Sequence, residues 1–456
     1  MKKLFFLLLI TSCIYGQTLT VWHTEGDPKT LEALDKIAKK FNNEFEGKNV
    51  RFQQVGWEDL YRKLNLAIEG GESPDITQIQ PFMAYYLYKK GLLLQIDDLI
   101  EKLDSEDIFE IVKILQNYDG HYYGLATALG LSYYAYRKDL IPDSLNLPTT
   151  WSSYLNLLDS ISISDSEKSP LLLPANDLHM TLLFTELLAS NGGAYFDSNG
   201  TLDIANQKVV ETLKFWKRLH DKISDKFKNT SYKENFSYFA RGNSATLPNF
   251  FGRGILQIER DASINDRTPE VFSFFPHITG PSGKVAYSTL DAEPWCILKS
   301  SQNATLAKEF LLFFYREDNY MTFCESVPIH LTPIFKSLAN STKYNSIPLV
   351  NKWKNFYNYS LNKIKKQEIR PIFMADISDR FQTSLFKLEG SHIISNMIRN
   401  VIYKNIPPDK AVEIAVEDAK QLEQTSKDES SQIYLIILIL IILIVILFSI
   451  GKKWKK

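Results

Sequence analysis

Apolar positions alternate, and then recur every three or four residues, along the first 90 residues, which predicts strands and helices in turn. Residues 18–22 alternate like a strand, and Asp27-Pro28 is a typical start for the helix that follows. Strands are then expected over 50–55 and 75–79, and helices over 57–68 and 83–90, the last stopping at Gly91. This order predicts an α/β fold with a parallel sheet and helices on both faces.

Beyond residue 130 the pattern becomes mainly helical. Helices are expected over 151–161, 181–190, 208–223, 377–402 and 408–422, and strands over 244–247, 271–275 and 295–298. The alternation of the first 90 residues is therefore followed by a region in which helices outnumber strands.

The composition predicts a large folded body. The 456 residues are 45% apolar, and 52 basic residues nearly balance 53 acidic ones. At about 150 residues per domain this predicts two to three domains, and the body lacks the basic excess typical of nucleic-acid binders. Seven histidines and three cysteines show no metal-ligand spacing, so we expect neither a metal nor a cofactor. Cys296 and Cys324 could pair, but buried free thiols are favoured.

The first 16 residues are typical of a secretory signal peptide. Lys2 and Lys3 precede the apolar run 4–10, and small or polar residues then lead to Gly16. Cleavage after Gly16 is the first expectation, and a lipoprotein site with Cys13 as the acylated residue is the alternative. On either interpretation the body is exported.

A second apolar run, 433–450, lies near the other end of the chain. At 1.5 Å per residue it would form about 27 Å of helix, close to the hydrocarbon thickness of a bilayer, so a transmembrane helix is expected. The basic tail 451–456 should lie in the cytoplasm. The polar stretch 423–432 is typical of a short stalk. The sequence therefore predicts an extracytoplasmic body that is joined by this stalk to a membrane anchor.

Short signatures along residues 18 to 422 are similar, in their order, to those of one known family. They are 19–23, 68–76 with its Pro74-Asp75-Ile76 turn, 90–93, 119–124 with 136–140, 148–151, 190–197, 239–246 and 307–311. This order resembles the extracellular solute-binding proteins of the maltose type, the sugar-binding subunits of ABC importers. Two departures from the family pattern are Ala126, where a proline is usual, and the acidic segment 290–295, which replaces a glycine-rich stretch.

The resemblance implies a two-lobe periplasmic-binding-protein fold of type II with an interlobe cleft. One lobe would hold 17–128 and 275–322 and the other 129–274 and 323–422, with crossings near 126–131, 270–276 and 321–327. A monomer of this kind would capture a sugar or oligosaccharide by hinge closure and deliver it to the transmembrane subunits of an ABC permease.

Candidate ligand-binding residues follow the expected strand ends, where α/β proteins place their ligands. Sugars need polar partners for hydroxyls and aromatic faces for C–H groups. Each candidate also has an ordinary structural interpretation, such as a surface histidine for His23, an exposed loop pair for Asp291 and Glu293, or a core residue for Phe250. The full set is His23, Thr24, Glu25, Gln80, Thr127, Asn176, His179, Asn249, Phe250, Asp291, Glu293 and Trp295.

An enzyme and a ligand-sensing receptor are the two alternative classes of function. An enzyme could use the cluster His23, Glu25 and Asp27, or Asp291 with Glu293 as a glycosidase pair. However, carboxylates two residues apart on one strand cannot easily flank a bond from opposite sides, so no enzymatic activity is expected. A ligand-sensing receptor that signals to a membrane partner is the alternative to import.

Overall fold

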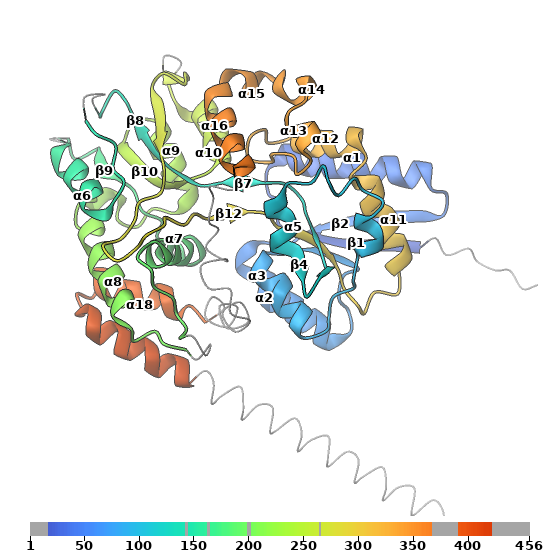
Figure 1. Ribbon diagram of the computed structural model, residues 1–456, viewed down its shortest axis with the longest axis horizontal. Helices are drawn as coiled ribbons and strands as arrows, with labels where there is room; N and C mark the ends of the chain where they lie inside the picture. Colours follow the sequence, from blue (N-terminus) through green and yellow to red (C-terminus); the bar gives the residue numbers. More distant parts are fainter. Residues whose placement is uncertain are drawn as a thin grey trace, which may run out of the picture.

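The computed structural model describes residues 17–141, 145–161, 165–197, 202–263, 266–366 and 391–421. These residues form two α/β lobes that lie side by side (Figure 1). The expected signal peptide with Cys13, the stalk, the apolar run 433–450 and the basic tail lie outside the described residues. Among the residues that are described, no helix is both long and apolar enough to cross a membrane.

The first lobe is built on a five-stranded sheet in the order β2-β1-β3-β13-β6. β1 is parallel to both β2 and β3, whereas β13 runs antiparallel to β3 and β6. Its elements are β1 (Gln17–His23), α1 (Pro28–Glu44), β2 (Lys48–Gln54), α2 (Trp57–Gly70), β3 (Ile76–Gln78), α3 (Pro81–Lys89), α4 (Asp97–Ile100), α5 (Glu110–Gln116), β4 (Asn117–Tyr118), β5 (His121–Tyr122), β6 (Leu125–Ala126), β13 (Pro294–Ile297), α11 (Ala304–Phe314), α12 (Glu317–Cys324), α13 (Lys336–Ala339) and α14 (Thr342–Asn345).

Local sequence signals explain why helices of the first lobe begin and end where the sequence predicts. Asp27 caps α1 by accepting a hydrogen bond from the Lys29 amide (3.0 Å), and Pro28 occupies the first helical position. The apolar face of α1 then packs on α11, where the ring of Phe41 lies 5.3 Å from that of Phe310. Gly91 adopts the left-handed conformation expected after α3.

The second lobe is built on a four-stranded sheet in the order β11-β8-β10-β9. β8 is antiparallel to β10 and β11, and the edge strand β9 carries Pro170, as edge strands tolerate. Its elements are β8 (Tyr133–Arg137), α6 (Trp151–Ser160), β9 (Ser169–Leu171), α7 (Asp177–Ser190), α8 (Gln207–His220), η1 (Asp225–Phe227), α9 (Tyr232–Ala240), β10 (Ser244–Phe250), α10 (Gly252–Asp261), β11 (Phe272–Phe275), α16 (Lys354–Lys365), α18 (Ile393–Ile402) and a helix over 408–421.

The chain passes between the lobes along two paired strands. β7 (Gly130–Leu131) carries it outward and β12 (Leu290–Asp291) carries it back, and the two pair antiparallel where the lobes meet (Figure 1). Beside them the backbones of Leu129 and Thr332 exchange hydrogen bonds of 2.8 and 3.1 Å. The third passage runs through α15 (Pro348–Lys352).

Three expectations need correction. The first sheet is mixed rather than parallel, because β13 enters it directly from the lobe junction and not through a helical crossover. The return crossing lies at β12 rather than at 270–276, because β11 pairs with β8 in the second sheet. The third crossing comes later than 321–327: the Lys336 amide donates to the Asp107 carbonyl of the first lobe (2.7 Å), whereas Trp353 donates to Glu259 of α10 (2.8 Å).

The other helices and strands that the sequence predicts begin and end close to the residues expected. The helix predicted over 377–402 is described only as α18, since 367–390 lie outside the described residues. Cys296 and Cys324 are free and buried, which confirms the preferred interpretation of the two thiols.

Candidate functional site

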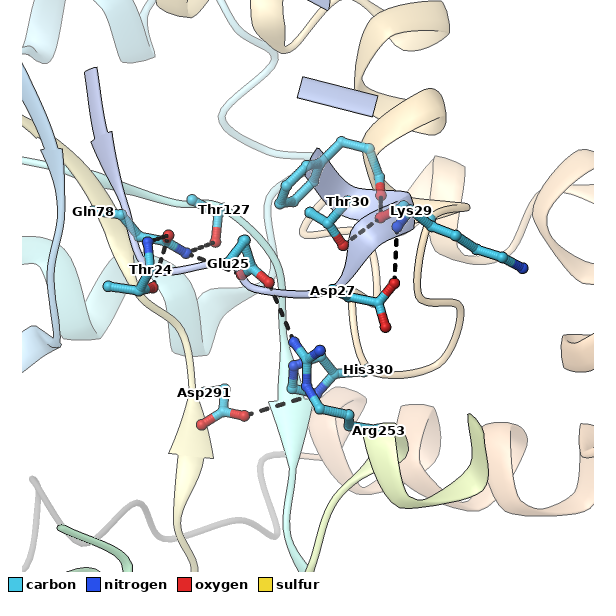
Figure 2. Close-up of polar contacts among 12 residues, drawn as sticks. Thr24, Glu25, Asp27, Lys29, Thr30, Gln78, Thr127, Arg253, Asp291 and His330 are labelled. Atoms are coloured by element: carbon cyan, nitrogen blue, oxygen red, sulfur yellow. Dashed lines mark hydrogen bonds and ion pairs between the residues drawn. The ribbon is translucent and has the colours of Figure 1, made fainter. Parts of the chain in front are cut away.

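The ends of three strands of the first sheet bring four polar side chains together. Gln78, the last residue of β3, accepts hydrogen bonds through Oε1 from the Thr24 amide (3.0 Å) and from the Thr24 hydroxyl (2.9 Å). Its Nε2 donates to Glu25 Oε1 and to Thr127 Oγ1, both at 3.3 Å (Figure 2). Gln78 therefore uses its acceptor and both donors to hold the residues that follow β1 and β6.

Glu25 also reaches the second lobe. Its Oε2 accepts from Arg253 Nη2 at 3.2 Å, and Arg253 lies in the first turn of α10 (Figure 2). A second cross-lobe pair joins Arg260 of the same helix to Asp27 at 3.1 Å. α10 approaches closely because of Gly252, where a Cβ would lie 2.7 Å from the amide nitrogen of His330.

Asp291 ends β12, and Glu293 lies in the short segment between β12 and β13. Leu290 and Ala292 are buried, whereas Asp291 and Glu293 are half-buried and lie close enough to interact electrostatically. Asp291 Oδ2 lies 3.9 Å from His330 Nδ1. Burial raises the pKa of Asp291 to about 7 and the pKa of Glu293 well above its usual value, and the nearby carboxyl groups add to both rises.

We call the group formed by Thr24, Glu25, Gln78, Thr127, Arg253, Asp291, Glu293 and His330 the interlobe cluster. It holds three carboxyl groups and one guanidinium. Burial also lowers the pKa of His330 well below its usual value, which keeps the imidazole neutral at physiological pH. The hydrogen-bonding groups of the cluster therefore come from both lobes.

Tyr232 lies beside the interlobe cluster, on the second lobe. Burial raises the pKa of its phenol, and Asp291 and Glu293 lie close enough to raise it further. Its ring stacks on His179 with 3.8 Å between the ring centroids. Asn176 holds the pair: its Nδ2 lies 2.7 Å from His179 Nδ1, and its Oδ1 accepts from the Tyr232 amide at 3.1 Å.

Asn249 lies at the end of β10 and has a left-handed backbone, with φ of 57°. Its Nδ2 donates to Thr289 Oγ1 at 3.3 Å, whereas its Oδ1 is buried without a hydrogen-bond partner. Asn249 thus contacts the segment that directly precedes β12.

Four predicted residues lie apart from these contacts. Phe250 and Trp295 are fully buried among aromatic rings, so neither presents a face that a ligand can reach. His23 is buried with its ring against Phe52, and burial lowers its pKa to about 4. Gln80 is the N-cap residue of α3, 3.5 Å from the Tyr61 hydroxyl.

Four residues near the strand ends were missed from the sequence: Gln78, Arg253, Tyr232 and His330. Gln78 was hidden because the third strand was expected to continue to Ile79. Arg253 and Tyr232 lie on the second lobe and His330 lies between α12 and α13, and no local pattern points to them. The structure does bring together Thr24, Glu25, Thr127, Asp291 and Glu293, with Asn176, His179 and Asn249 on the opposite side.

A pocket of about 420 Å³ lies on the first lobe, lined by Lys102, Tyr315, Tyr320 and Phe335 among others, and none of the predicted residues lines it. No three or more histidine, cysteine, aspartate or glutamate side chains of the described ranges are grouped to hold a metal ion.

Comparison with known proteins gives the relatives of this chain. The diacetylchitobiose-binding protein DasA of Streptomyces coelicolor is 26% identical over 305 residues, which cover 65% of this chain and 68% of that protein. An arabinooligosaccharide-binding protein of Bacillus subtilis is 23% identical over 320 residues, 65% of this chain and 69% of that protein.

Solved structures show the same fold. The GacH receptor of Streptomyces glaucescens matches with a TM-score of 0.69 at 17% identity, covering 89% of this chain and 98% of that one. MalE3 of T. maritima, solved with maltose, matches with a TM-score of 0.70 at 17% identity, covering 90% and 99%. A family model described as bacterial extracellular solute-binding protein matches residues 36–352, well over half of the chain. The chain therefore belongs to the bacterial extracellular solute-binding protein family.

Proposed function

We propose that this protein captures a carbohydrate between its two lobes and delivers it to the permease of an ABC importer. The observation that carries the proposal is the interlobe cluster, in which strand ends of the first lobe meet Arg253 of the second. Its carboxyl, amide, hydroxyl and guanidinium groups offer both donors and acceptors, which is what a ligand rich in hydroxyls requires. Tyr232 and His179 add aromatic surface beside it.

The names of the relatives support a sugar ligand. DasA is named for diacetylchitobiose and the Bacillus subtilis protein for arabinooligosaccharides. Both are binding proteins for short saccharides, so a saccharide is the ligand class that we carry over to this chain.

Capture would proceed by closure of the lobes about the paired strands β7 and β12 and the neighbouring Leu129–Thr332 contact. A ligand that touches residues of both lobes favours the closed form by its difference in affinity for the closed and open forms. The closed form would then be recognised by the permease.

We propose that the protein binds its ligand and does not catalyse a reaction on it. Asp291 and Glu293 are two residues apart in the chain and lie close together, so they would contact the same side of a ligand. Glycoside hydrolysis needs two carboxyl groups that flank the scissile bond.

We also propose that the body works outside the cytoplasm and is anchored through residues 433–450. The support is the sequence alone: an apolar run of bilayer length followed by four lysines in 451–456. Cell fractionation tests the anchor, because the whole chain should remain with membranes washed in high salt. A chain that ends at Gln424 should be released, unless Cys13 is acylated. Retention of that chain after Cys13→Ser would overturn the C-terminal anchor.

The test of the binding function is a thermal-shift screen of the purified protein against mono- and oligosaccharides, polyols, amino acids and peptides. A ligand present at 100 times its dissociation constant stabilises the folded state by about 2.7 kcal/mol. Stabilisation by a saccharide would support the proposal. Stabilisation only by an amino acid or a peptide would overturn the ligand class.

A further inference from the structure

We propose that Glu186 of α7 is the positioning residue of the hinge, because its carboxyl group ties both crossing strands, β7 and β12, to the second lobe and so controls how far the lobes separate. This inference rests on the lobe closure of the proposed function and does not depend on which ligand is bound. It follows from the hydrogen bonds that meet at one buried oxygen atom.

The Glu186 carboxyl group contacts the second-lobe ends of both crossing strands. Its Oε2 accepts hydrogen bonds from the amide (3.0 Å) and the hydroxyl (3.2 Å) of Thr289, which directly precedes β12. Ser132, which directly follows β7, donates to the same oxygen at 3.4 Å. The Ser132 amide also donates to the Thr289 carbonyl at 3.2 Å. The two strand ends and the carboxyl group of α7 thus form one connected unit.

α7 is a rigid anchor for these contacts, and it lies beside the crossing strands (Figure 1). All its residues from Met180 to Ser190 are buried, and Glu186 is 1% exposed. Ser190, at the end of the helix, accepts a hydrogen bond from the Tyr287 amide (2.9 Å), so α7 holds the returning chain at a second point. We therefore expect the strand ends to move with the second lobe, and the bending of the hinge to take place within β7 and β12.

The two carboxyl oxygens of Glu186 differ in their surroundings. Oε1 is buried, accepts no hydrogen bond from the described residues, and lies 3.6 Å from His277 Nε2. Burial raises the pKa of Glu186 to about 8 and lowers the pKa of His277 to about 3, so the acid keeps its proton and the imidazole is neutral at pH 7. Tyr134 also faces Glu186, and burial raises the pKa of its phenol well above the usual value, so it is neutral as well. Oε1 is therefore the oxygen that carries the proton.

Ionisation of Glu186 should loosen this clamp. Within the described part of the chain, His277 is the single basic side chain in ion-pair distance of Glu186, and it is neutral, so a carboxylate here is a buried charge without a cation. Water relieves that cost only when Ser132 and Thr289 move away from the carboxyl group. The freed strand ends then lengthen the flexible part of the hinge. Because the clamped form has the higher pKa, it is favoured at low pH and lost as the pH rises through about 8.

The experiment measures the distance between the lobes in the whole unliganded protein. Spin labels at the exposed positions Lys39 on the first lobe and Asp225 on the second report its mean and its spread at pH 6 and at pH 9. In the natural protein both should increase at pH 9, the mean by several ångströms. Glu186→Gln keeps an oxygen acceptor for Thr289 but cannot ionise, so its distance at pH 9 should equal its distance at pH 6.

Two further variants complete the experiment. Glu186→Leu removes the acceptor and should lengthen the distance already at pH 6. Glu413→Gln, on the exposed surface of the second lobe, is the matched control and should keep the pH response of the natural protein. Asp291, whose pKa burial raises to about 7, also titrates in this range, but it is present in every variant and cannot account for a difference between them.

The outcomes separate this inference from the proposed function. A pH response that persists in Glu186→Gln overturns the inference, as does a natural protein with the same distance at both pH values. An unchanged distance in folded Glu186→Leu overturns the clamp. Should Glu186→Leu fail to fold, the comparison of Glu186→Gln with the natural protein still decides. The ligand screen is independent of these distances, so carbohydrate binding stands if the inference fails, and the inference is decided even if no saccharide binds.

Discussion

Arg253 of α10 and Glu25 of the segment after β1 join the two lobes through an ion pair, with 3.2 Å between Nη2 and Oε2. The Glu25 side chain is 9% exposed and that of Arg253 27% exposed, so the pair is mostly shielded from water. Together with the pair between Arg260 and Asp27 it holds α10 against the first lobe. The contact between the lobes is therefore partly electrostatic.

Replacement of Arg253 should open the unliganded protein. Arg253→Met leaves the Glu25 carboxylate buried without its cation, and separation of the lobes returns that carboxylate to water. Spin labels at the exposed positions Lys39 and Asp225, one on each lobe, would report a longer mean distance.

The matched control for this experiment is Arg241→Met. Arg241 pairs with Asp261 at 3.5 Å, and both residues lie on the second lobe. This variant should leave the distance between the labels unchanged. An equal lengthening in both variants, or none in Arg253→Met, would contradict the electrostatic contact.

Gln78 should be more important for stability than its uncharged side chain suggests. Gln78→Leu leaves Thr24, Glu25 and Thr127 without the partner that joins them, and each buried group left unpaired costs about 1–3 kcal/mol. Urea unfolding should show the loss as a lower midpoint. Gln95→Leu, on the exposed surface, is the control and should change the midpoint little; equal effects of the two variants would refute the role given to Gln78.

Glu186 should make stability depend on pH. It is buried beside His277, Ser132 and Thr289, and burial raises its pKa from 4.5 to about 8. Because the folded pKa is the higher one, its contribution to the free energy of unfolding is fully present below about pH 4.5. That contribution is lost as the pH rises through about 8.

Glu186→Gln removes this titration. The variant should become more stable relative to the natural protein as the pH rises from 5 to 9, which denaturant titrations at a series of pH values would measure. A difference in free energy that stays constant over this range would show that Glu186 does not titrate there.

Gly124 should tolerate no side chain. A Cβ at this position would lie 2.7 Å from Pro294 Cβ and 2.8 Å from Cys296 Sγ, so Gly124→Ala overpacks the region just before β6 and costs about 1–3 kcal/mol. Thermal unfolding would measure the loss. Gly56→Ser is the control, because Gly56 has open space around it and serine is a good N-cap for α2; equal destabilisation of both variants would contradict the packing argument.

Much of the first lobe was predictable because its signals are local. The cap at Asp27, the proline at the start of α1 and the left-handed glycine after α3 act through neighbouring atoms, and the structure has each where it was expected. The same holds for Thr24, Glu25 and Thr127, because polar residues that follow strands of one sheet meet at one edge.

The crossings and half of the interlobe cluster were not predictable in this way. β11 and β12 are both short, and only their pairing partners decide that β11 belongs to the second sheet and β12 to the junction. Arg253 lies 228 residues from Glu25, and nothing near it in the sequence distinguishes it from an ordinary surface arginine.

The sequence by itself thus determined the family, the alternation of elements in the first lobe and the polar residues at its strand ends, because each depends on short stretches of chain. Only the tertiary structure decided which carboxyl group receives a cation. That choice depends on how the two lobes meet, and their meeting places Arg253 against Glu25 and His330 3.9 Å from Asp291.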